Sequence, residues 1–365
     1  MTEKPPYRVP LMAEIDALEP NGFVAASTFS GCGGSSLGYR MAGFKLGYAN
    51  EFIPEARATY EANARPYTVV DGRDIRTVQA ADVLTACGVK PGGLDLFDGS
   101  PPCASFSTAG KRSEGWGVVR KYSDSKQRTD DLFFEFARLV DGIKPKTFVA
   151  ENVAGLVRGV AVGYFNDVLE LLRSLGYRVG ARVLDAQWLG VPQQRMRIIF
   201  VGVREDLGLD PAYPEPLDYR YNVGDACPWM TDGATEEHPG VMDGIDISRY
   251  AIGAEWDKCA EGQQSDRFFS LIRASRSKPA PTILASHGGE SIAGVCHPTE
   301  KRKFSIAEVR RLCSFPDDFK LTGTYQQKWE RMGRAVPPVM MAAVASAVRD
   351  KVLIPYRDLR EARKR

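Results

Sequence analysis

The chain contains 365 residues, of which 44% are hydrophobic and 26% are charged, and its formal net charge is +2. This composition is typical of a globular protein with one large domain and one smaller domain. It excludes a membrane-spanning protein, because no apolar stretch is long enough to cross a bilayer, and residues 1–22 lack the apolar core of a signal peptide.

The cysteines and histidines indicate a reducing compartment and no metal site. Seven cysteines are an odd number, and the sequence has no Cys-x-x-Cys pair. His238, His287 and His297 are too scattered to suggest a zinc site. We therefore expect a cytoplasmic protein without a bound metal.

The first predicted strand, 23–29, runs into a loop that contains Gly31, Gly33 and Gly34. Glycines let the backbone approach a ligand closely before a helix begins. A second strand, 45–50, is followed by Glu51, and an acid in this place suits a ribose diol. The loop alone fits any nucleotide-like ligand.

Two further strands end in reactive groups. An apolar run at 94–98 is followed by a Gly-Ser-Pro-Pro turn and Cys103, and the strand 147–151 ends in Glu151. The carboxyl ends of parallel strands form the edge where open α/β sheets bind ligands. A free cysteine is most often a small buried apolar residue, but a thiol and a carboxyl at one edge indicate nucleophilic attack with a partner that protonates or hydrogen-bonds the substrate.

Two arginines begin the last strand, 197–203. Arg195 and Arg197 are two residues apart, so we expect them on one face. They are either solvated arginines or fixed donors to carbonyl or phosphate oxygens.

Strand and helix patterns alternate from 23 to 204, which predicts an α/β fold with a doubly wound, Rossmann-like sheet. We expect helices near 34–42, 53–63, 130–142 and 162–175, and further strands near 67–70 and 178–185. The last two strands lack a helix between them, which predicts an antiparallel edge. The segment 205–300 has an irregular composition. Helical patterns return at 306–313 and 339–352, so 301–355 should complete the first domain, and 356–365 should be a frayed basic tail.

A basic segment follows Cys103. It contains Lys111, Arg112, Arg120 and Lys121 among several glycines, which predicts a mobile loop that closes on a polyanion. Without the neighbouring motifs, such a charge run would be interpreted as a solvated face. Residues 232–266 are acidic instead and should face away from phosphates.

Taken together, these motifs resemble the DNA (cytosine-5) methyltransferase family. The resemblance covers nearly the whole chain and rests on the glycine loop at 29–34, Pro-Cys at 102–103, Glu-Asn-Val at 151–153, Gln-x-Arg-x-Arg at 193–197 and Gly-Arg-Ala-Val at 333–336. It implies S-adenosylmethionine as the cofactor and double-stranded DNA as the substrate. It also implies that Cys103 attacks C6 of a flipped-out cytosine, that Glu151 hydrogen-bonds the ring nitrogen and amine, and that Arg197, with Arg195 near it, binds the ring carbonyl.

The same resemblance implies a cofactor site and a recognition region. The implied cofactor residues are Phe29, Gly31, Gly33 and Gly34 around the methionine, Glu51 at the ribose, Phe52, Asp74 and Ile75 at the adenine, Ser100, Pro101 and Leu132 along the pocket, and Ala335 and Val336 closing it. The segment 205–300 takes the position of the target recognition domain. Two residues depart from the family pattern, Ala104 for Gln and Arg334 for Asn.

Three alternatives stay open. A tRNA cytosine-5 methyltransferase would typically carry Cys-Phe-Thr within 205–300, where none occurs. The departures permit a catalytically silent DNA-binding relative, and the glycine loop alone permits an oxidoreductase. We expect a monomer associated with the nucleoid, in a restriction-modification or epigenetic context, with any cognate endonuclease acting on the same site without a stable complex.

Overall fold

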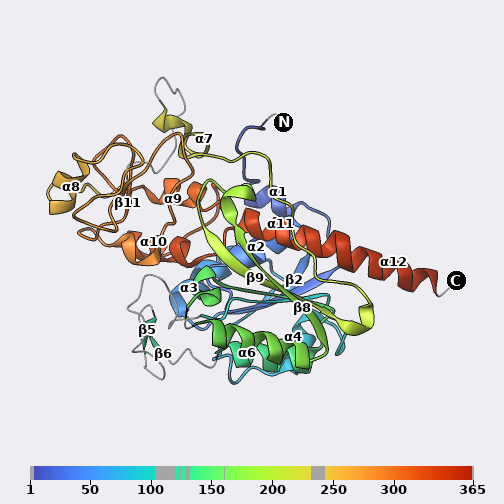
Figure 1. The fold of residues 1–365 in the computed structure, drawn as a ribbon. Helices are drawn as coiled ribbons and strands as arrows, with labels where there is room; N and C mark the ends of the chain where they lie inside the picture. Colours follow the sequence, from blue (N-terminus) through green and yellow to red (C-terminus); the bar gives the residue numbers. More distant parts are fainter. Residues whose placement is uncertain are drawn as a thin grey trace.

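The computed structural model describes residues 4–102, 120–122, 125–127, 132–159, 161–231 and 243–363. Its centre is a seven-stranded sheet of order β3-β2-β1-β4-β7-β9-β8 (Figure 1). The strands are β1 (Val24–Thr28), β2 (Lys45–Asn50), β3 (Val69–Asp71), β4 (Leu96–Gly99), β7 (Thr147–Val153), β8 (Tyr177–Asp185) and β9 (Met196–Arg204). The pairs from β3 to β7 are parallel, and β9 runs antiparallel to both of its neighbours. The Rossmann-like class and the antiparallel edge are confirmed.

Helices cover both faces of this sheet because its strands alternate two sets of apolar side chains. Phe97 and Phe148 point into one core, whereas Leu96 and Val149, their neighbours in sequence, point into the other. The first core is closed by α4 (Ala80–Cys87), α5 (Leu132–Ile143) and α6 (Ala161–Ser174). The second is closed by α2 (Gly34–Met41) and α11 (Pro338–Val348). The sequence prediction missed α4 and placed α2, α3 (Pro54–Glu61), α5 and α6 within two residues of their bounds.

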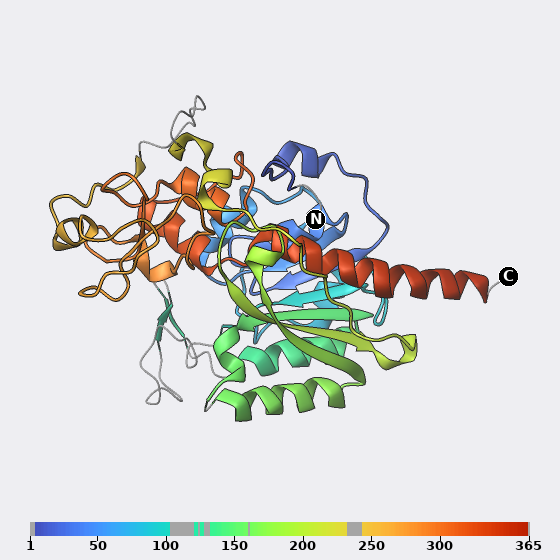
Figure 2. The same cartoon turned by 45° about the horizontal axis from the view of Figure 1, so that its top comes forward.

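The chain returns to the first domain through α11, whereas the sequence pattern predicted that this return begins at residue 301. This helix packs against α2 so closely that a Cβ on Gly38 would lie 2.6 Å from the Pro338 carbonyl oxygen. A π-helical turn, Arg349–Leu353, continues α11 into α12 (Ile354–Ala362), and the two form one rod that projects from the body (Figures 1 and 2). The expectation of a frayed tail from residue 356 is therefore wrong up to Ala362, because the helical hydrogen bonds of α11 propagate through the π turn.

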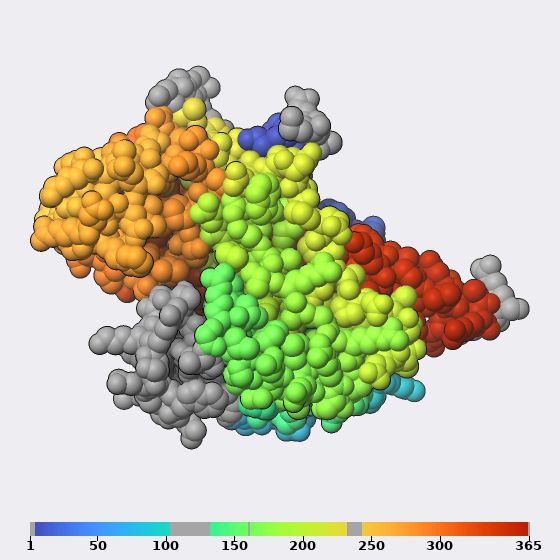
Figure 3. Space-filling view, viewed as in Figure 1, coloured from blue at the N-terminus to red at the C-terminus, as the bar shows by residue number. Residues whose placement is uncertain are grey.

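After β9, Leu207, Ala212 and Tyr213 still pack on the first domain, and the later residues up to α11 form a second lobe beside it (Figure 3). Its regular elements are α7 (Val223–Ala226), α8 (Ala251–Trp256), β10 (Ile272–Arg273), β11 (Val295–Cys296), α9 (Ile306–Leu312) and α10 (Tyr325–Arg334). Its core also takes in Cys32 of the glycine loop, Leu37 of α2 and Ile15 of α1 (Met12–Asp16). The lobe and the cofactor-type loop thus share one packed core.

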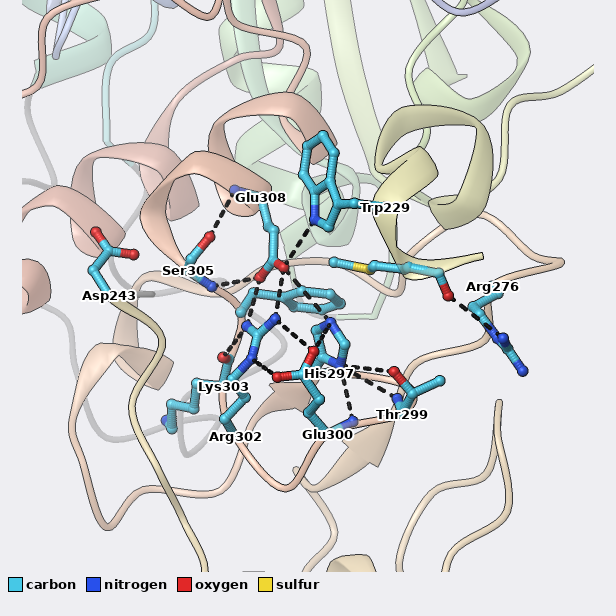
Figure 4. A network of polar contacts seen from close by, with 12 residues as sticks. Trp229, Asp243, Arg276, His297, Thr299, Glu300, Arg302, Lys303, Ser305 and Glu308 are labelled. Atoms are coloured by element: carbon cyan, nitrogen blue, oxygen red, sulfur yellow. Dashed lines mark hydrogen bonds and ion pairs between the residues drawn. The ribbon is translucent and has the colours of Figure 1, made fainter. Parts of the chain in front are cut away.

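Buried ion pairs hold part of this lobe together (Figure 4). Arg302 donates to both carboxylate oxygens of Glu308 at 2.8 Å, and the backbone N–H of Ser305 donates to the same group at 2.6 Å. Burial would raise the pKa of Glu308, but the hydrogen bonds from Arg302, together with the neighbouring His297 at 3.6 Å, outweigh burial and lower that pKa to about 2. The start of α9 is therefore fixed to the 297–303 segment.

In the described part of the chain, no helix is long and apolar enough to cross a membrane. The same residues contain no cluster of three or more His, Cys, Asp or Glu side chains suited to a metal ion.

Candidate functional site

A cleft of about 1650 Å³ lies at the carboxyl ends of the parallel strands. Its walls come from the loops after β1, β2, β4 and β7 and, opposite them, from α10 and the 282–286 segment of the second lobe. Ligands bind at this edge in open α/β sheets. The geometry thus brings the predicted motifs and the second lobe to one place.

The glycine loop is shaped by backbone conformations that other residues adopt at a cost. Phe29 itself has a left-handed φ of 53°, an uncommon state that marks functional sites. Gly31 and Gly33 have φ values of 56° and 97°. A Cβ on Gly34, where α2 begins, would lie 2.2 Å from the carbonyl oxygen of Val336, so this close approach requires glycine.

Glu51 joins this loop to the second strand. Its carboxylate accepts hydrogen bonds of 2.7 Å from the backbone N–H groups of Gly31 and Ile53. The residue is 7% exposed, and burial raises its pKa although the two hydrogen bonds oppose the shift. A buried carboxylate that still lines the cleft can accept hydrogen bonds from the hydroxyl groups of a ribose.

The structure brings the predicted cofactor residues together, with one exception. Phe29, Gly31, Gly34, Glu51, Phe52, Asp74, Ile75, Ser100, Pro101, Leu132, Ala335 and Val336 all line the cleft. Gly33 packs instead against the ring of Tyr60. The partly exposed ring of Phe52, the carboxylate of Glu51 and the glycine loop lie in one cleft, an arrangement that fits a nucleoside-like ligand.

Glu151 and Arg197 form an ion pair inside the cleft. The Nε of Arg197 lies 2.7 Å from Oε1 of Glu151, and both side chains are largely buried. Val153 pairs with Arg197 across β7 and β9, so Glu151, two residues earlier, lies on the same face as the arginine. The side chain of Asn152 donates to the carbonyl of Pro101 at 3.1 Å and ties the pair to the proline turn.

That turn ends at Pro102, which lines the cleft; Cys103 lies outside the described residues. Lys111 and Arg112 also lie outside them. Arg120 and Lys121 belong to β5 (Arg120–Tyr122), which pairs antiparallel with β6 (Ser125–Gln127). The predicted nucleophile and the predicted DNA contacts therefore stay predictions.

Arg195 and Arg197 have different surroundings. β9 begins at Met196, so Arg195 precedes the strand and the two-residue alternation does not extend to it. Arg195 is 1% exposed and donates to the carbonyls of Ile283, at 3.3 Å, and Gly333, at 2.9 Å. Its contacts join the sheet to the second lobe, whereas Arg197 lines the cleft.

Sequence reasoning missed the role of Asp98 at the end of β4. This buried carboxyl accepts hydrogen bonds of 2.8 Å from Ser27 and from Tyr39. Burial raises its pKa to about 7, the two hydrogen bonds oppose the shift, and the charge of Glu151 adds to it. The signal available in the sequence was an acidic residue within an otherwise apolar strand, which indicates a buried carboxyl group.

Phe269 was also missed. It is 87% exposed and lines the cleft from the second lobe. No periodicity in an irregular segment could have identified it.

The comparisons with known proteins show the family of the chain. The C-5 cytosine-specific DNA methylase family profile matches residues 23–350. Type II methyltransferase M1.HphI of Haemophilus parahaemolyticus is 33% identical over 333 residues, which cover 88% of this chain and 85% of the relative. Type II methyltransferase M.PspPI of Psychrobacter is 31% identical, covering 91% and 80%.

Solved structures show the same fold. An Escherichia coli prophage-encoded protein described as a DNA modification methyltransferase superposes with a TM-score of 0.71 at 22% identity, covering 91% of this chain and all of that one. A mutant DNMT2 of Spodoptera frugiperda gives a TM-score of 0.63 at 15% identity, with 91% and 100% coverage.

Proposed function

The chain belongs to the C-5 cytosine-specific DNA methylase family, and we propose that Cys103, Glu151 and Arg197 carry its transfer of a methyl group to cytosine C5 in DNA. The protein is a DNA (cytosine-5) methyltransferase with Type II methyltransferases among its relatives. The observation that supports these roles is the ion pair between Glu151 and Arg197, which lies beside the turn that leads to Cys103.

The chemistry explains why a thiol and an acid are needed. The C5 atom of cytosine is a poor nucleophile. When the thiolate of Cys103 bonds to C6, electron density moves to C5, provided that the ring nitrogen is hydrogen-bonded or protonated, which is the role of Glu151. Arg197 holds Glu151 in place and donates to the ring carbonyl. C5 would then bond to the methyl group that the cofactor supplies as the bond from that methyl group to the sulfonium sulfur breaks. Loss of the C5 proton to a base and elimination of the Cys103 thiolate would restore the aromatic ring.

The glycine loop and Glu51 hold S-adenosylmethionine in this proposal. The loop takes the methionine end, Glu51 the ribose, and Phe52 stacks on the adenine, with Asp74 and Ile75 at its edge. When bound, the cofactor supplies an electrophilic methyl group.

The second lobe serves as the target recognition domain. It faces the sheet across the cleft and exposes Phe269 there. The target base must leave the duplex to reach the pair at the bottom of the cleft. Double-stranded DNA is the proposed partner, bound in part by the basic segment after Cys103, in a restriction-modification context.

Covalent trapping tests the function. DNA that contains 5-fluorocytosine cannot release a proton from C5, so the enzyme should remain bonded to it in the presence of S-adenosylmethionine. A denaturation-resistant complex is expected with the parent protein and not with Cys103→Ser, which should still bind cofactor and DNA. A complex with fluorinated tRNA and not with DNA would support the tRNA alternative. No complex with either would favour a silent DNA-binding relative.

A further inference from the structure

Arg331 is a buried cation in the cleft that the proposed mechanism does not use. It lies in the last turn of α10, is 3% exposed, and lines the cleft together with Gly31 and Glu51. Its backbone carbonyl lies 3.7 Å from the Sγ of Cys32 in the glycine loop. The guanidinium therefore belongs to the cofactor side of the cleft.

This guanidinium is incompletely paired. Its Nη2 is buried and has no hydrogen-bond partner among the residues that the structure describes. Its Nη1 lies 3.7 Å from Glu330 Oε2, beyond hydrogen-bond distance, and the other oxygen of Glu330 accepts from Arg334 at 2.8 Å. A buried charged donor without an acceptor is costly, so the site calls for an anion.

Neighbouring carboxylates do not fill this role. Burial raises the pKa of Glu51 and the positive charge of Arg331 opposes this rise, but the carboxylate oxygens of Glu51 accept hydrogen bonds from the backbone N–H groups of Gly31 and Ile53. The phosphates of a DNA duplex stay at the protein surface, where a residue that is 3% exposed is poorly placed to meet them. The anion should therefore come from a small molecule that enters the cleft.

We propose that Arg331 binds the α-carboxylate of S-adenosylmethionine. This carboxylate is the cofactor's one anionic group, and the proposed orientation puts the methionine end at the glycine loop, next to Arg331. The guanidinium would pair with it through the unpartnered Nη2, and the methyl donor would be held at a fixed depth in the cleft. The inference rests on the proposed use of S-adenosylmethionine.

A ligand pair that differs only in the carboxylate tests it. Calorimetry would compare S-adenosylhomocysteine with its decarboxylated analogue, on the parent protein and on Arg331→Met. A charge-assisted hydrogen bond predicts that Arg331→Met binds S-adenosylhomocysteine about 10- to 100-fold more weakly. The decarboxylated ligand should bind both proteins equally, within about twofold.

Two more variants make the result specific. Arg331→Lys keeps the charge and should show a smaller loss confined to the carboxylate ligand; it carries the test if Arg331→Met does not fold. Arg334→Met removes the other arginine on Glu330 and should leave the ratio of the two affinities unchanged.

Several results would overturn the proposal. Equal weakening of both ligands would make Arg331 a structural residue, and a carboxylate-selective loss in Arg334→Met alone would assign the site to Arg334. Weaker DNA binding with intact S-adenosylhomocysteine affinity would make Arg331 a DNA contact. A parent protein that binds neither ligand would instead refute the proposed function.

Discussion

Replacing Asp98 with Asn should remove a pH-dependent loss of stability. The ordinary pKa of an aspartate is 3.8, and burial raises that of Asp98 to about 7 in the folded protein. Below pH 4 the group is protonated in both states and has no effect. As pH rises from 4 to 7, Asp98 ionises in the unfolded chain but stays protonated in the folded protein. Folding must then take up a proton, so the free energy of unfolding decreases with pH.

The magnitude follows from the two pKa values. A difference of about three pH units at 1.36 kcal/mol per unit amounts to about 4 kcal/mol, reached above pH 7. Asparagine has nearly the same shape, cannot ionise, and offers one acceptor and one donor to the hydroxyls of Ser27 and Tyr39. We therefore expect the stability of Asp98→Asn relative to the parent to rise by about 4 kcal/mol between pH 4 and pH 8.

Urea unfolding at pH 4, 5, 6, 7 and 8 measures this difference, and other titrating groups cancel between the two proteins. Asp206→Asn is a control of opposite sign, because a hydrogen bond from Arg204 lowers the pKa of Asp206. That carboxylate is more than half exposed, so its effect should be small. A difference between parent and Asp98→Asn that stays constant across the range would refute the reasoning.

Four further variants test the site and the packing around it. Glu151→Gln should slow methyl transfer by about 10²- to 10⁴-fold, and single-turnover rates within twofold of the parent would remove Glu151 from the mechanism. Glu51→Ala should weaken cofactor binding about 10- to 100-fold without changing DNA affinity in the absence of cofactor; unaltered calorimetric affinity would contradict the ribose role. Gly38→Ala should destabilise the protein by about 1–3 kcal/mol, because its Cβ would meet the Pro338 carbonyl at 2.6 Å. Gly163→Ala in α6 has open space within 4 Å and should instead stabilise by about 0.5–1 kcal/mol; equal effects of the two in thermal unfolding would refute the packing argument.

Much of the first domain could be predicted because its signals are local. Apolar strands, glycine turns and helix periodicity depend on neighbours within a few residues, so β1, β2, β4, β7 and β9 lie where the sequence placed them. The parallel order then follows from the alternation of strand and helix. The same logic placed Glu51 and Glu151 at one edge, where both line the cleft.

The second lobe shows where local signals end. Two strands of two residues and a short α8 leave no periodicity to detect, and the lobe is held by contacts between segments far apart in sequence. The ion pair between Arg302 and Glu308 joins residues only six apart, yet neither residue's neighbours in sequence indicate that it is buried.

The sequence by itself determined the motifs typical of the family, the alternation of strands and helices along the first domain, and the chemical groups at the edge of its sheet. Tertiary structure alone decided which of those groups meet the cleft. Arg195 and Arg197 are alike in sequence, yet one is buried against backbone carbonyls and the other pairs with Glu151. Burial likewise leaves the Nη2 of Arg331 without a partner among the described residues and raises the pKa of Asp98. Charge and hydrogen-bonding capacity belong to the residue, but desolvation and partners come from segments that only folding brings together.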